Sequence, residues 1–424
     1  MPEIKGFRGL VYNRKKIESF DEVLCPPYDV IPSEMQDDLY LKSPYNAIRL
    51  ELPKEEDRYE AAAVRFQDWQ AVNILVRDEK EAIYPYNQTF TTKEGKTYTR
   101  KGLIAACKLY EFSEGKVLPH EKTLSGPKVD RLNLFKKTEA NFSCIFGLYA
   151  DPQKTVDSLI GAHTEKCPPI IDAMDYQNCR NLMWRIDDPK VISKVKAAML
   201  DKRILIADGH HRYETGVAYR DLRKEANPNH TGNEPYNFIM MYVANMYDEG
   251  LVIFPTHRLV HSLPDFNFDL FAQKLEAHFK LTPLDNKDAA KAFLKAHPHS
   301  AFVLAGREAM LGLMLASDVQ KVIPEAISPA LKQLDVVLLH QAILGNLLGI
   351  SLEAQAKQTN LMYSKDFDEV FEKVASRKAQ AGFLMNPTKI EEVTEVAESG
   401  EVMPQKSTFF YPKLLTGVIF NSLA

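Results

Sequence analysis

Residues 208–212 read Asp-Gly-His-His-Arg, and their types and spacing suit the binding of an anion. An apolar run begins at Ile204 and stops at the aspartate, and a helical pattern starts directly after the glycine. Glycine lets a ligand approach the backbone closely, and the first N–H groups of a helix point towards an anion. The two histidines and the arginine would add charge-assisted hydrogen bonds. The stretch therefore predicts a strand, a polar turn and a helix N-terminus that hold a nucleotide phosphate.

Two other interpretations of this stretch stay open. Buried strands commonly end in Asp-Gly turns that bind nothing. His210 and His211 are residue types that ligate metals, but they lack the i, i+4 spacing that places two ligands on one helix face. We therefore favour the phosphate site over a metal site at these two histidines.

A second polar group surrounds a Gly-Pro pair in residues 119–131. It contains His120 and Glu121, followed by Lys128, Asp130 and Arg131. We expect the glutamate to act as the general base for a substrate hydroxyl, with the histidine beside it in the catalytic group. The lysine and arginine would neutralise phosphate, and Asp130, together with Asp208, would hold a magnesium ion. A solvated, charge-rich loop is the alternative.

Three further segments carry polar residues among prolines. Pro26 and Pro27 restrain the backbone before Tyr28 and Asp29, which we expect either to face a cleft or, equally, to provide a cap for a helix starting near Ser33. His257 and Arg258 follow a strand-like run and are either structural or part of a site. Residues 401–424 place substrate candidates among aromatic residues, which predicts a segment docked back near the site. These candidates are Lys406, Ser407 and Thr408, with Lys413 as a further cation beside Lys122 and Lys128.

Composition limits the class of protein. The chain has 424 residues, of which 45% are hydrophobic and 26% charged, so it can bury two or three cores. The formal net charge of −4 does not favour a nucleic-acid partner. A secretory leader and a long apolar span are both missing from its pattern, so we expect a cytoplasmic protein without a membrane partner. A homodimer stays open.

The five cysteines are odd in number and widely spaced, which argues against both a disulfide framework and a zinc site. Cys25 lies in the proline-rich turn and is the one candidate for a reactive thiol. A small buried hydrophobic role is the favoured interpretation of that residue.

Periodicity supplies the elements that would position these residues. Residues 46–52 alternate like a strand, residues 58–72 have helical spacing, and residues 82–110 read as a hairpin around Gly95. From residue 268 onward, helices and strands alternate as in an α/β unit. We predict an α+β domain over residues 1–265, a smaller α/β domain over 266–400, and the docked segment 401–424.

Beyond these patterns, the sequence resembles a known family. The segment 208–212 is similar to the phosphate-binding motif of the ParB/sulfiredoxin-like superfamily. Over nearly its whole length the chain resembles the bacterial domain-of-unknown-function family 1015. This wider resemblance rests on five segments, which are Cys25-Pro-Pro-Tyr-Asp-Val, Pro119-His-Glu-Lys-Thr, Ala207-Asp-Gly-His-His-Arg-Tyr-Glu-Thr, Pro255-Thr-His-Arg and Met403-Pro-Gln-Lys-Ser-Thr.

The resemblance implies a ParB-like nucleotide-binding core with large insertions and an appended α/β domain. By analogy with the superfamily's free-serine kinases, it implies phosphate contacts from Gly209, His210, His211 and Arg212, and a positioning role for Asp208. The corresponding activity is a phosphotransferase using ATP or ADP and Mg²⁺, with free L-serine or O-phosphoserine as the leading substrate. The kinase glutamate does not align to this chain, so Glu121 is chosen on its local chemistry, with Asp29 as the second choice.

Other members of the superfamily fit less well. Sulfiredoxin chemistry needs a cysteine in the phosphate turn, where this chain has two histidines. Chromosome-partition proteins should carry a basic face, which the mild acidity of this chain does not favour. Two alternatives to the kinase stay open, namely a phosphohydrolase or nucleotidase, and a nucleotide sensor that does not turn its ligand over.

Overall fold

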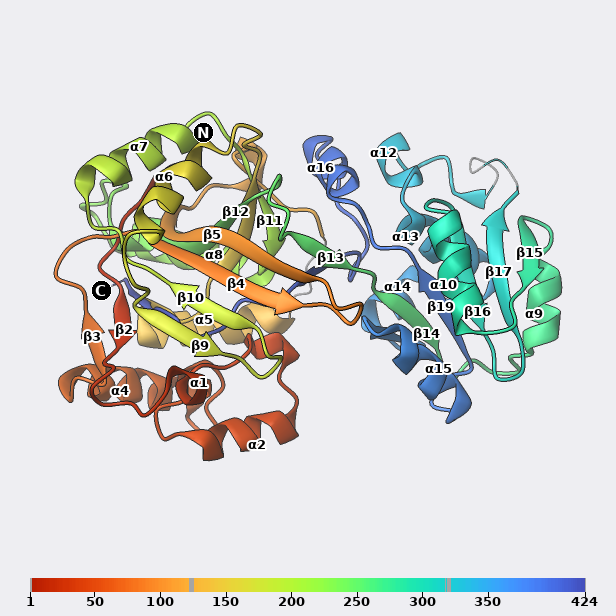
Figure 1. Cartoon of the computed structure of the whole chain (residues 1–424), viewed down its shortest axis with the longest axis horizontal. Coiled ribbons are helices and arrows are strands. Elements are labelled where there is room, and N and C mark those ends of the chain that lie inside the picture. Colours follow the sequence, from red (N-terminus) through yellow and green to blue (C-terminus); the bar gives the residue numbers. More distant parts are fainter. Residues whose placement is uncertain (1, 122–125, 317, 319–321, 424) are drawn as a thin grey trace. The chain divides into compact units, whose positions relative to one another are not determined.

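The computed structural model describes residues 2–121, 126–316, 318 and 322–423. The chain forms two compact units, which are drawn in Figure 1. The first unit comprises Met1–Pro119, Thr123–Val252 and Pro412–Ala424, and the second comprises His120–Lys122 and Ile253–Tyr411. The chain therefore leaves the first unit after Val252 and returns to it at Pro412.

A nine-stranded mixed sheet forms the centre of the first unit. Its strands are β1 (Ile4–Lys5), β4 (Tyr84–Thr91), β5 (Thr97–Lys108), β6 (Val117–Leu118), β8 (Ile145–Tyr149), β9 (Ile171–Met174), β10 (Arg180–Met183), β11 (Ile204–Asp208) and β12 (Phe238–Asn245). Their order is β6-β11-β8-β12-β5-β4-β10-β9, with β1 paired to β5. The pairs β6–β11 and β8–β12 are parallel, and the other neighbours are antiparallel.

The helices of the first unit are α1 (Phe20–Val23), α2 (Ser33–Lys42), α3 (Ile48–Glu51), α4 (Arg58–Ala71), α5 (Gly126–Thr138), α6 (Thr155–Thr164), α7 (Pro189–Met199) and α8 (His210–Ala226), with the short 3₁₀ turns η1 (Tyr28–Val30), η2 (Phe112–Glu114) and η3 (Pro235–Asn237). Two small strand pairs complete it, β2 (Leu10–Tyr12) with β3 (Leu75–Arg77) and β7 (Ala140–Asn141) with β21 (Asn421–Ser422). Every residue of β12 is buried, as the continuous apolar run of a central strand requires. Helix α8 packs on α5 and on this part of the sheet, which fixes the direction of its N-terminus.

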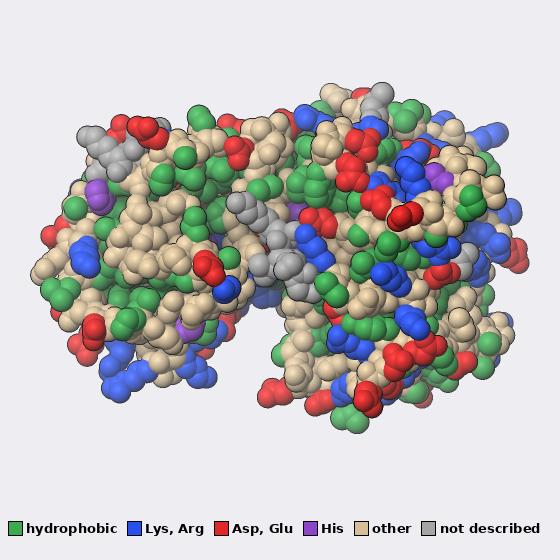
Figure 2. Space-filling view, turned by 180° about the vertical axis from the view of Figure 1, so that it is seen from behind, with side chains coloured by type: hydrophobic (Ala, Val, Ile, Leu, Met, Phe, Trp, Pro, Cys, Tyr) green, Lys and Arg blue, Asp and Glu red, His purple; other side chains and the backbone are tan. Residues whose placement is uncertain are grey.

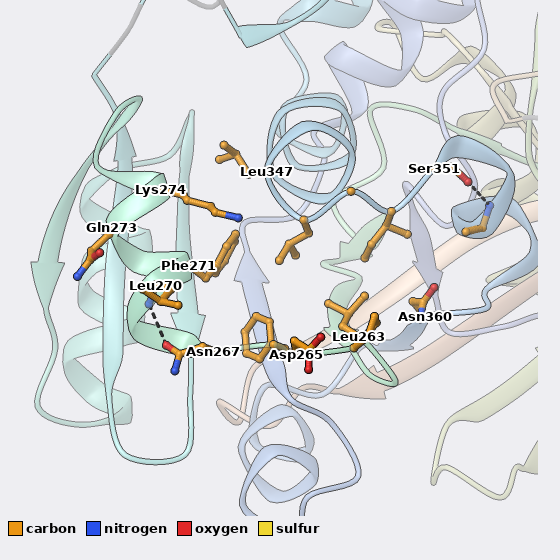
Figure 3. Close-up of a pocket in the computed structure, with 16 residues that line it drawn as sticks. Leu263, Asp265, Asn267, Leu270, Phe271, Gln273, Lys274, Leu347, Ser351 and Asn360 are labelled. Carbon is orange, nitrogen blue, oxygen red and sulfur yellow. Dashed lines mark hydrogen bonds between the residues drawn. The ribbon is translucent and has the colours of Figure 1, made fainter.

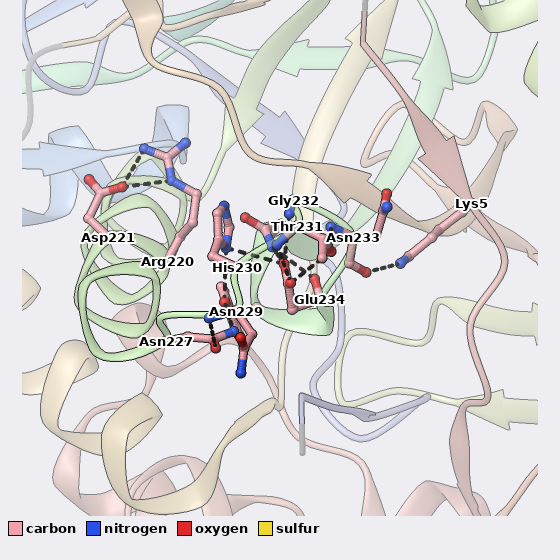
Figure 4. A network of polar contacts seen from close by, with 12 residues as sticks. Lys5, Arg220, Asp221, Asn227, Asn229, His230, Thr231, Gly232, Asn233 and Glu234 are labelled. Carbon is pink, nitrogen blue, oxygen red and sulfur yellow. Dashed lines mark hydrogen bonds and ion pairs between the residues drawn. The ribbon is translucent and has the colours of Figure 1, made fainter.

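The opposite end of α8 is held by a polar loop, residues 227–234 (Figure 4). The Glu234 carboxylate accepts hydrogen bonds from the backbone N–H groups of Thr231 and Gly232. Although desolvation opposes ionisation, these bonds lower the pKa of Glu234 to about 2. His230 lies 3.2 Å from the same carboxylate and stacks on Tyr236. The loop therefore anchors the helix at the end remote from the 208–212 turn.

The second unit is built on a six-stranded antiparallel sheet. Its strands are β14 (His257–Val260), β15 (Phe279–Pro283), β16 (Ala301–Ala305), β17 (Met310–Leu315), β18 (Leu361–Ser364) and β19 (Ala381–Met385), in the order β15-β17-β16-β19-β14-β18. The strands β13 (Val252–Phe254) and β20 (Phe409–Tyr411) pair separately. The helices are α9 (Phe268–Leu275), α10 (Lys287–Ala296), α12 (Pro329–Lys332), α13 (Asp335–Leu338), the π-helix η4 (Leu339–Leu347), α14 (Leu352–Lys357), α15 (Phe367–Ala375) and α16 (Ile390–Glu398).

Local sequence explains where several of these helices begin. The side chains of Asn267 and Asn286 accept backbone hydrogen bonds at the starts of α9 and α10, and Asp366 does the same for α15. Helices α10 and α15 then pack their apolar residues on the sheet, around the buried residues of β16 and β19. The mixture of helices and several sheets agrees with the predicted α+β class.

Most predicted elements are present, including the hairpin β4–β5 with Gly95 at a positive φ, and helix α4. The strand predicted over residues 46–52 is wrong, because this segment contains helix α3. The side chain of Asn46 accepts the N–H of Ile48 and thereby starts a helical turn. Leu50 and Glu51, which would face opposite sides of a strand, are both buried.

The division of the chain also differs from the boundary predicted after residue 265. Strand β14 makes its hydrogen bonds with β18 and β19, so it belongs with the second unit. Residues 401–411 also lie in the second unit, whereas 412–424 belong to the first. Whether the two units are separate functional domains stays a prediction.

Charge is intermixed on the surface. On the face drawn in Figure 2, Lys and Arg side chains alternate with Asp and Glu side chains over the first unit. Within the described part of the chain, none of the helices combines the length and the apolarity that a bilayer crossing requires.

Candidate functional site

The predicted strand, turn and helix at residues 204–226 are present. Strand β11 is buried up to Ala207. Gly209 then adopts φ +91°, a left-handed conformation that residues with a Cβ atom rarely take. Helix α8 begins at His210. The first N–H groups of an α-helix have no partner within the helix and carry its positive dipole end. The sequence thus places the N-terminus of α8 directly after a buried strand.

The buried side chain of Arg212 contacts this turn. Its side chain is buried, its Nη1 donates to the carbonyl oxygen of Cys144, and its Nη2 lies 3.8 Å from Oδ2 of Asp208. A Cβ atom at Gly209 would come within 3.0 Å of the guanidinium. Burial works against the charge of Arg212, but the nearby Asp208 and Asp29 carboxylates raise its pKa overall. The arginine is therefore a charged support for the turn.

Lys413 supplies a second positive charge to the turn. Its Nζ lies 3.1 Å from Oδ2 of Asp208, and its side chain is 13% exposed. The backbone beside it is fixed, because Arg100 donates to the carbonyl of Pro412 at 2.7 Å and Gln88 donates to the carbonyl of Lys413 at 3.1 Å. Lys413, one of the lysines considered from sequence, therefore pairs with Asp208 through its ammonium group.

The structure also reveals a buried carboxylate that the sequence analysis missed. Glu51 is 2% exposed, and its Oε1 accepts hydrogen bonds from Arg131 Nη1 at 3.3 Å and Ser143 Oγ at 3.2 Å. Within the described residues its Oε2 has no hydrogen-bond partner. The charge of Glu51 acts on both Tyr28 and Arg212. The sequence analysis missed Glu51 because it predicted a strand here, and in a strand Glu51 and the apolar Leu50 would face opposite sides.

Tyr28 and Asp29 lie in the short turn η1, after the two prolines. Burial raises the pKa of Tyr28 to about 12, and the ring carries the Arg131 guanidinium over its face at 4.3 Å. Asp29 is exposed, and its charge acts on both Tyr28 and Arg212. The alternative role of Asp29 as a helix cap is wrong, because Pro32 occupies that position. Tyr28 and Asp29 are therefore close enough to the 208–212 turn to affect the pKa of Arg212.

The residues predicted on the 119–131 segment are engaged with protein groups. Asp130 pairs with Arg58 at 2.7 Å and with Arg131, and accepts the Tyr59 hydroxyl at 2.9 Å. Burial opposes this charge, but the arginines and the hydroxyl lower the pKa of Asp130 overall. Lys128 pairs with Glu214 of α8 at 2.8 Å. Lys122, another predicted cation, lies outside the described residues.

The two histidines of the turn differ in exposure. His210 is buried and His211 is half-buried, both in the first turn of α8. In the described ranges no group of three or more His, Cys, Asp or Glu side chains is arranged to hold a metal ion. Cys25 is buried against Thr416, and burial raises the pKa of its thiol well above the usual value, so the apolar role fits this cysteine.

A second polar group forms in the second unit. Glu121 Oε1 accepts the backbone N–H of Lys406 at 2.9 Å, and His120 Nε2 lies 2.9 Å from Thr408 Oγ1. Arg258 is fully buried and donates from Nη2 to the carbonyl of Lys406 at 3.0 Å. Lys406 itself has φ +57° and an exposed side chain. Two of the predicted segments, 119–121 and 406–408, therefore meet here.

The other members of this group have internal partners. Ser407 Oγ donates to the carbonyl of Pro404 at 2.6 Å. His257 Nδ1 accepts the N–H of Met385 at 3.3 Å, and burial lowers its pKa to about 4. The predicted residues thus divide between the two units, with Tyr28, Asp29, residues 128–131 and residues 208–212 in the first and residues 120–121 and 406–408 in the second.

The fold is that of a mixed α/β protein in which Arg212 supports a glycine turn between β11 and α8. The profile of the family described as "Protein of unknown function (DUF1015)" matches residues 4–337. The chain belongs to this family. No curated protein matches the chain well enough to count as a relative.

Solved structures show a distant likeness. A conserved hypothetical protein from Pyrococcus furiosus is 14% identical, with a TM-score of 0.36, covering 74% of this chain and 92% of that one. A free serine kinase in complex with AMP is 12% identical with a TM-score of 0.34, covering 73% and 86%. SbnI with a C-terminal truncation, from Staphylococcus aureus, is 9% identical with a TM-score of 0.35, covering 74% and 85%.

Proposed function

We propose that this protein is a nucleotide-dependent phosphotransferase that acts on a small hydroxylated metabolite, with free L-serine as the leading substrate. The observation that carries the proposal is the turn at Gly209, which combines a left-handed glycine, the N-terminus of α8 and two supporting cations in one unit. Such a turn is suited to phosphate oxygens. The resemblance of residues 208–212 to the ParB/sulfiredoxin-like motif supports the same assignment and a core of that type.

In this proposal the helix N-terminus binds the phosphates of ATP or ADP. The left-handed conformation of Gly209 sets the direction in which α8 begins, and the N–H groups at His210 and His211 donate to the phosphate oxygens. The ammonium of Lys413 neutralises charge that develops on the transferred group. Arg212 keeps Asp208 in place, since its guanidinium lies between that carboxylate and the carbonyl of Cys144.

Magnesium is proposed at Asp208, whose carboxylate would help to hold the ion; a bound ion would lower the negative charge of the phosphates. Both oxygens of Asp208 have protein partners, because Oδ1 accepts the Gly209 N–H at 3.0 Å and Oδ2 pairs with Lys413, so the ion would compete with the lysine for this carboxylate. Asp130 is the weaker half of the predicted pair, because Arg58, Arg131 and Tyr59 already bind its two oxygens. Lys128 and Arg131 are likewise weaker phosphate ligands, since each pairs with a carboxylate of the protein.

The general base has two candidates. Glu121 was chosen from sequence, and its Oε1 accepts the N–H of Lys406 in the second unit. Glu51 lies in the same unit as the turn and has a buried Oε2 without a hydrogen-bond partner in the described residues, so we favour it. In the proposed step the substrate oxygen attacks the terminal phosphorus, the bond to the nucleotide oxygen breaks, and the hydroxyl proton passes to the carboxylate.

Phosphorus NMR on the full chain tests the proposal. The protein is mixed with Mg²⁺, ATP or ADP, and a panel of hydroxylated metabolites led by L-serine. We expect a new phosphomonoester signal that weakens strongly in Lys413→Met and Arg212→Ala, with circular dichroism used to confirm that each variant is folded. Release of inorganic phosphate alone would indicate a phosphohydrolase, and nucleotide binding without turnover would indicate a sensor; either result overturns the kinase assignment.

A further inference from the structure

A cavity of about 710 Å³ lies within the second unit, between α9 and the residues that connect η4 to α14 (Figure 3). This volume is in the range of small-molecule sites, about 300–1,000 Å³. Its wall combines polar residues with an apolar group formed by Phe266, Leu270, Phe271, Leu347 and Ile350. Leu270 is 59% exposed, which is unusual for a large apolar side chain beside a cavity. The wall therefore favours a ligand with an apolar body.

Charge at the cavity favours an anionic head group. Lys274 extends its ammonium group towards the cavity next to Phe271, as Figure 3 shows, and no hydrogen bond or ion pair to it is present among the described residues. Asp265, the lining carboxylate, precedes α9, whereas Lys274 lies in the last turn of that helix. At 1.5 Å per residue the two positions are separated by roughly 10 Å or more. The carboxylate of a ligand bound next to Lys274 would therefore lie away from the negative charge of Asp265.

The wall of the cavity is connected to a series of hydrogen bonds between buried polar side chains. The amide Nε2 of Gln355 donates to the carbonyl of the lining residue Ile350 at 2.8 Å. Its Oε1 lies 2.8 Å from Nδ1 of His340, and both side chains are 4% exposed. Burial, followed by the charge of Arg258, lowers the pKa of His340 to about 3. The imidazole is therefore neutral, and its Nδ1–H donates to the glutamine.

The same series of hydrogen bonds continues to the Lys406 segment. Nε2 of His340 accepts a hydrogen bond from Nε of Arg258 at 3.1 Å, as a neutral ring with its proton on Nδ1 can. Arg258 Nη2 donates to the carbonyl of Lys406, whose N–H donates to Glu121. Each member is hydrogen-bonded to the next, so these bonds connect residues 350–355 with the Lys406 segment.

The element that can shift is the π-helix η4, which contains His340 and ends at the cavity wall. Its last turn is marked by the hydrogen bond from Leu348 N–H to the carbonyl of Ile343 at 3.0 Å. A π-helix of nine residues is long, because most π-helices are single turns inserted in α-helices, often at functional positions. A Cβ at Gly345 would come within 3.1 Å of the His340 carbonyl oxygen. A side chain at position 345 would therefore crowd the π register, and glycine suits it.

We propose that this cavity is a regulatory site for a small carboxylate with an apolar body, and that its occupation is transmitted to Lys406 through η4, Gln355, His340 and Arg258. The ligand packs on Leu347 at the end of η4, and this contact biases the register of the helix. A change of register turns His340, which in turn moves the hydrogen-bond partner of Arg258. The proposal is independent of the reaction assigned above.

Binding is tested on the full chain with 4-phenylbutyrate, and with 4-phenylbutanol as the uncharged control. We expect calorimetry to give at least tenfold tighter binding of the acid, and we expect Lys274→Gln to abolish that preference while leaving the alcohol unchanged. Equal affinity for the two probes would mean an adventitious additive only. That result, or the absence of binding at millimolar concentration, overturns the site.

Transmission is tested by amide hydrogen exchange of the peptide that contains residues 403–408. We expect bound 4-phenylbutyrate to change its exchange rate several-fold, and Gly345→Ala, which favours the α register, to change it without ligand. Gly161→Ala, a helical glycine whose added Cβ meets open space, is the matched control and leaves the rate unchanged. Unchanged exchange in the presence of bound probe and in Gly345→Ala overturns the transmission. Neither readout requires turnover, so failure here is distinct from failure of the phosphotransferase assignment.

Discussion

The ammonium group of Lys413 lies 3.1 Å from the carboxylate of Asp208, although most of the second unit separates these residues in sequence. The pairing depends on a backbone that Arg100 and Gln88 hold through the carbonyls of residues 412 and 413. The 208–212 turn therefore receives this ammonium group from the last segment of the first unit.

Replacement of Lys413 by methionine should weaken the binding of nucleotide about tenfold, because the turn loses a positive charge near the phosphate. The free energy of unfolding should fall by about 2 kcal/mol, a usual value for a hydrogen bond to a charged group. Urea unfolding and nucleotide titration measure the two effects. Lys137→Met is the matched control, since Lys137 pairs with Glu60 at 2.8 Å on the surface and should change neither quantity appreciably. Equal effects of the two substitutions would contradict the prediction.

Gly209→Ala should be more harmful than an alanine at another left-handed glycine. Both substitutions cost about 1 kcal/mol for the positive φ. Only at Gly209 does the added Cβ also press on the Arg212 guanidinium, at 3.0 Å. Gly95→Ala is the control, because Gly95 has φ +81° and open space around its Cβ. We expect thermal unfolding to show both losses, and nucleotide affinity to fall in Gly209→Ala alone.

The two candidate bases are distinguished by parallel glutamine substitutions. Glu51→Gln should lower kcat by about 10²- to 10⁴-fold, because the amide cannot accept the hydroxyl proton, while nucleotide binding stays close to normal. Glu121→Gln should leave kcat within a few-fold, since its Oε1 contact with the Lys406 N–H can be kept by the amide oxygen. The opposite ranking in steady-state kinetics would restore Glu121 as the base.

Acid stability of the second unit should depend on Asp335. Burial is the main cause that raises the pKa of this carboxyl to about 6, with the charge of Glu392 adding to it. The folded state therefore holds this proton more tightly than the unfolded state. The stabilisation that results is complete below pH 3.8 and is lost as the pH rises through about 6. The difference corresponds to about 3 kcal/mol at most.

Asp335→Asn removes this dependence but can still accept the N–H of Ser300. His257 and His340, with pKa values lowered to about 4 and about 3, act in the opposite direction and cost stability as the pH falls below 6.5. Urea unfolding between pH 4 and 7 should therefore show a steeper acid loss in the variant than in the wild type. Parallel curves for the two proteins would show that Asp335 does not titrate in this range.

The sequence predicted those elements whose burial follows a simple period. Strand β11, the turn at Gly209 and helix α8 were found because an apolar run, a glycine and a helical pattern adjoin one another. The strand prediction for residues 46–52 failed because the Asn46 side chain accepts a hydrogen bond from the Ile48 N–H and so starts a helix within an alternating pattern. A local capping contact therefore outweighed the period of the residues that follow.

The site was predictable only where its residues adjoin in sequence. Residues 208–212 could be recognised together, whereas the partners Glu51, Arg131 and Lys413 come from distant segments. Single-sequence reasoning could name Lys413 as one cation among four, but only the fold selects it. Conversely, Asp130 and Lys128 looked available in sequence and proved to be paired with charged groups of the protein.

The discontinuity of the first unit has a consequence for biosynthesis. Residues 412–424 are translated after the whole of the second unit, and they contribute β21 as well as Lys413. A nascent chain can therefore fold the nine-stranded sheet before the 208–212 turn has its lysine. Because domains fold as they emerge from the ribosome, the turn is completed only after both units have been synthesised.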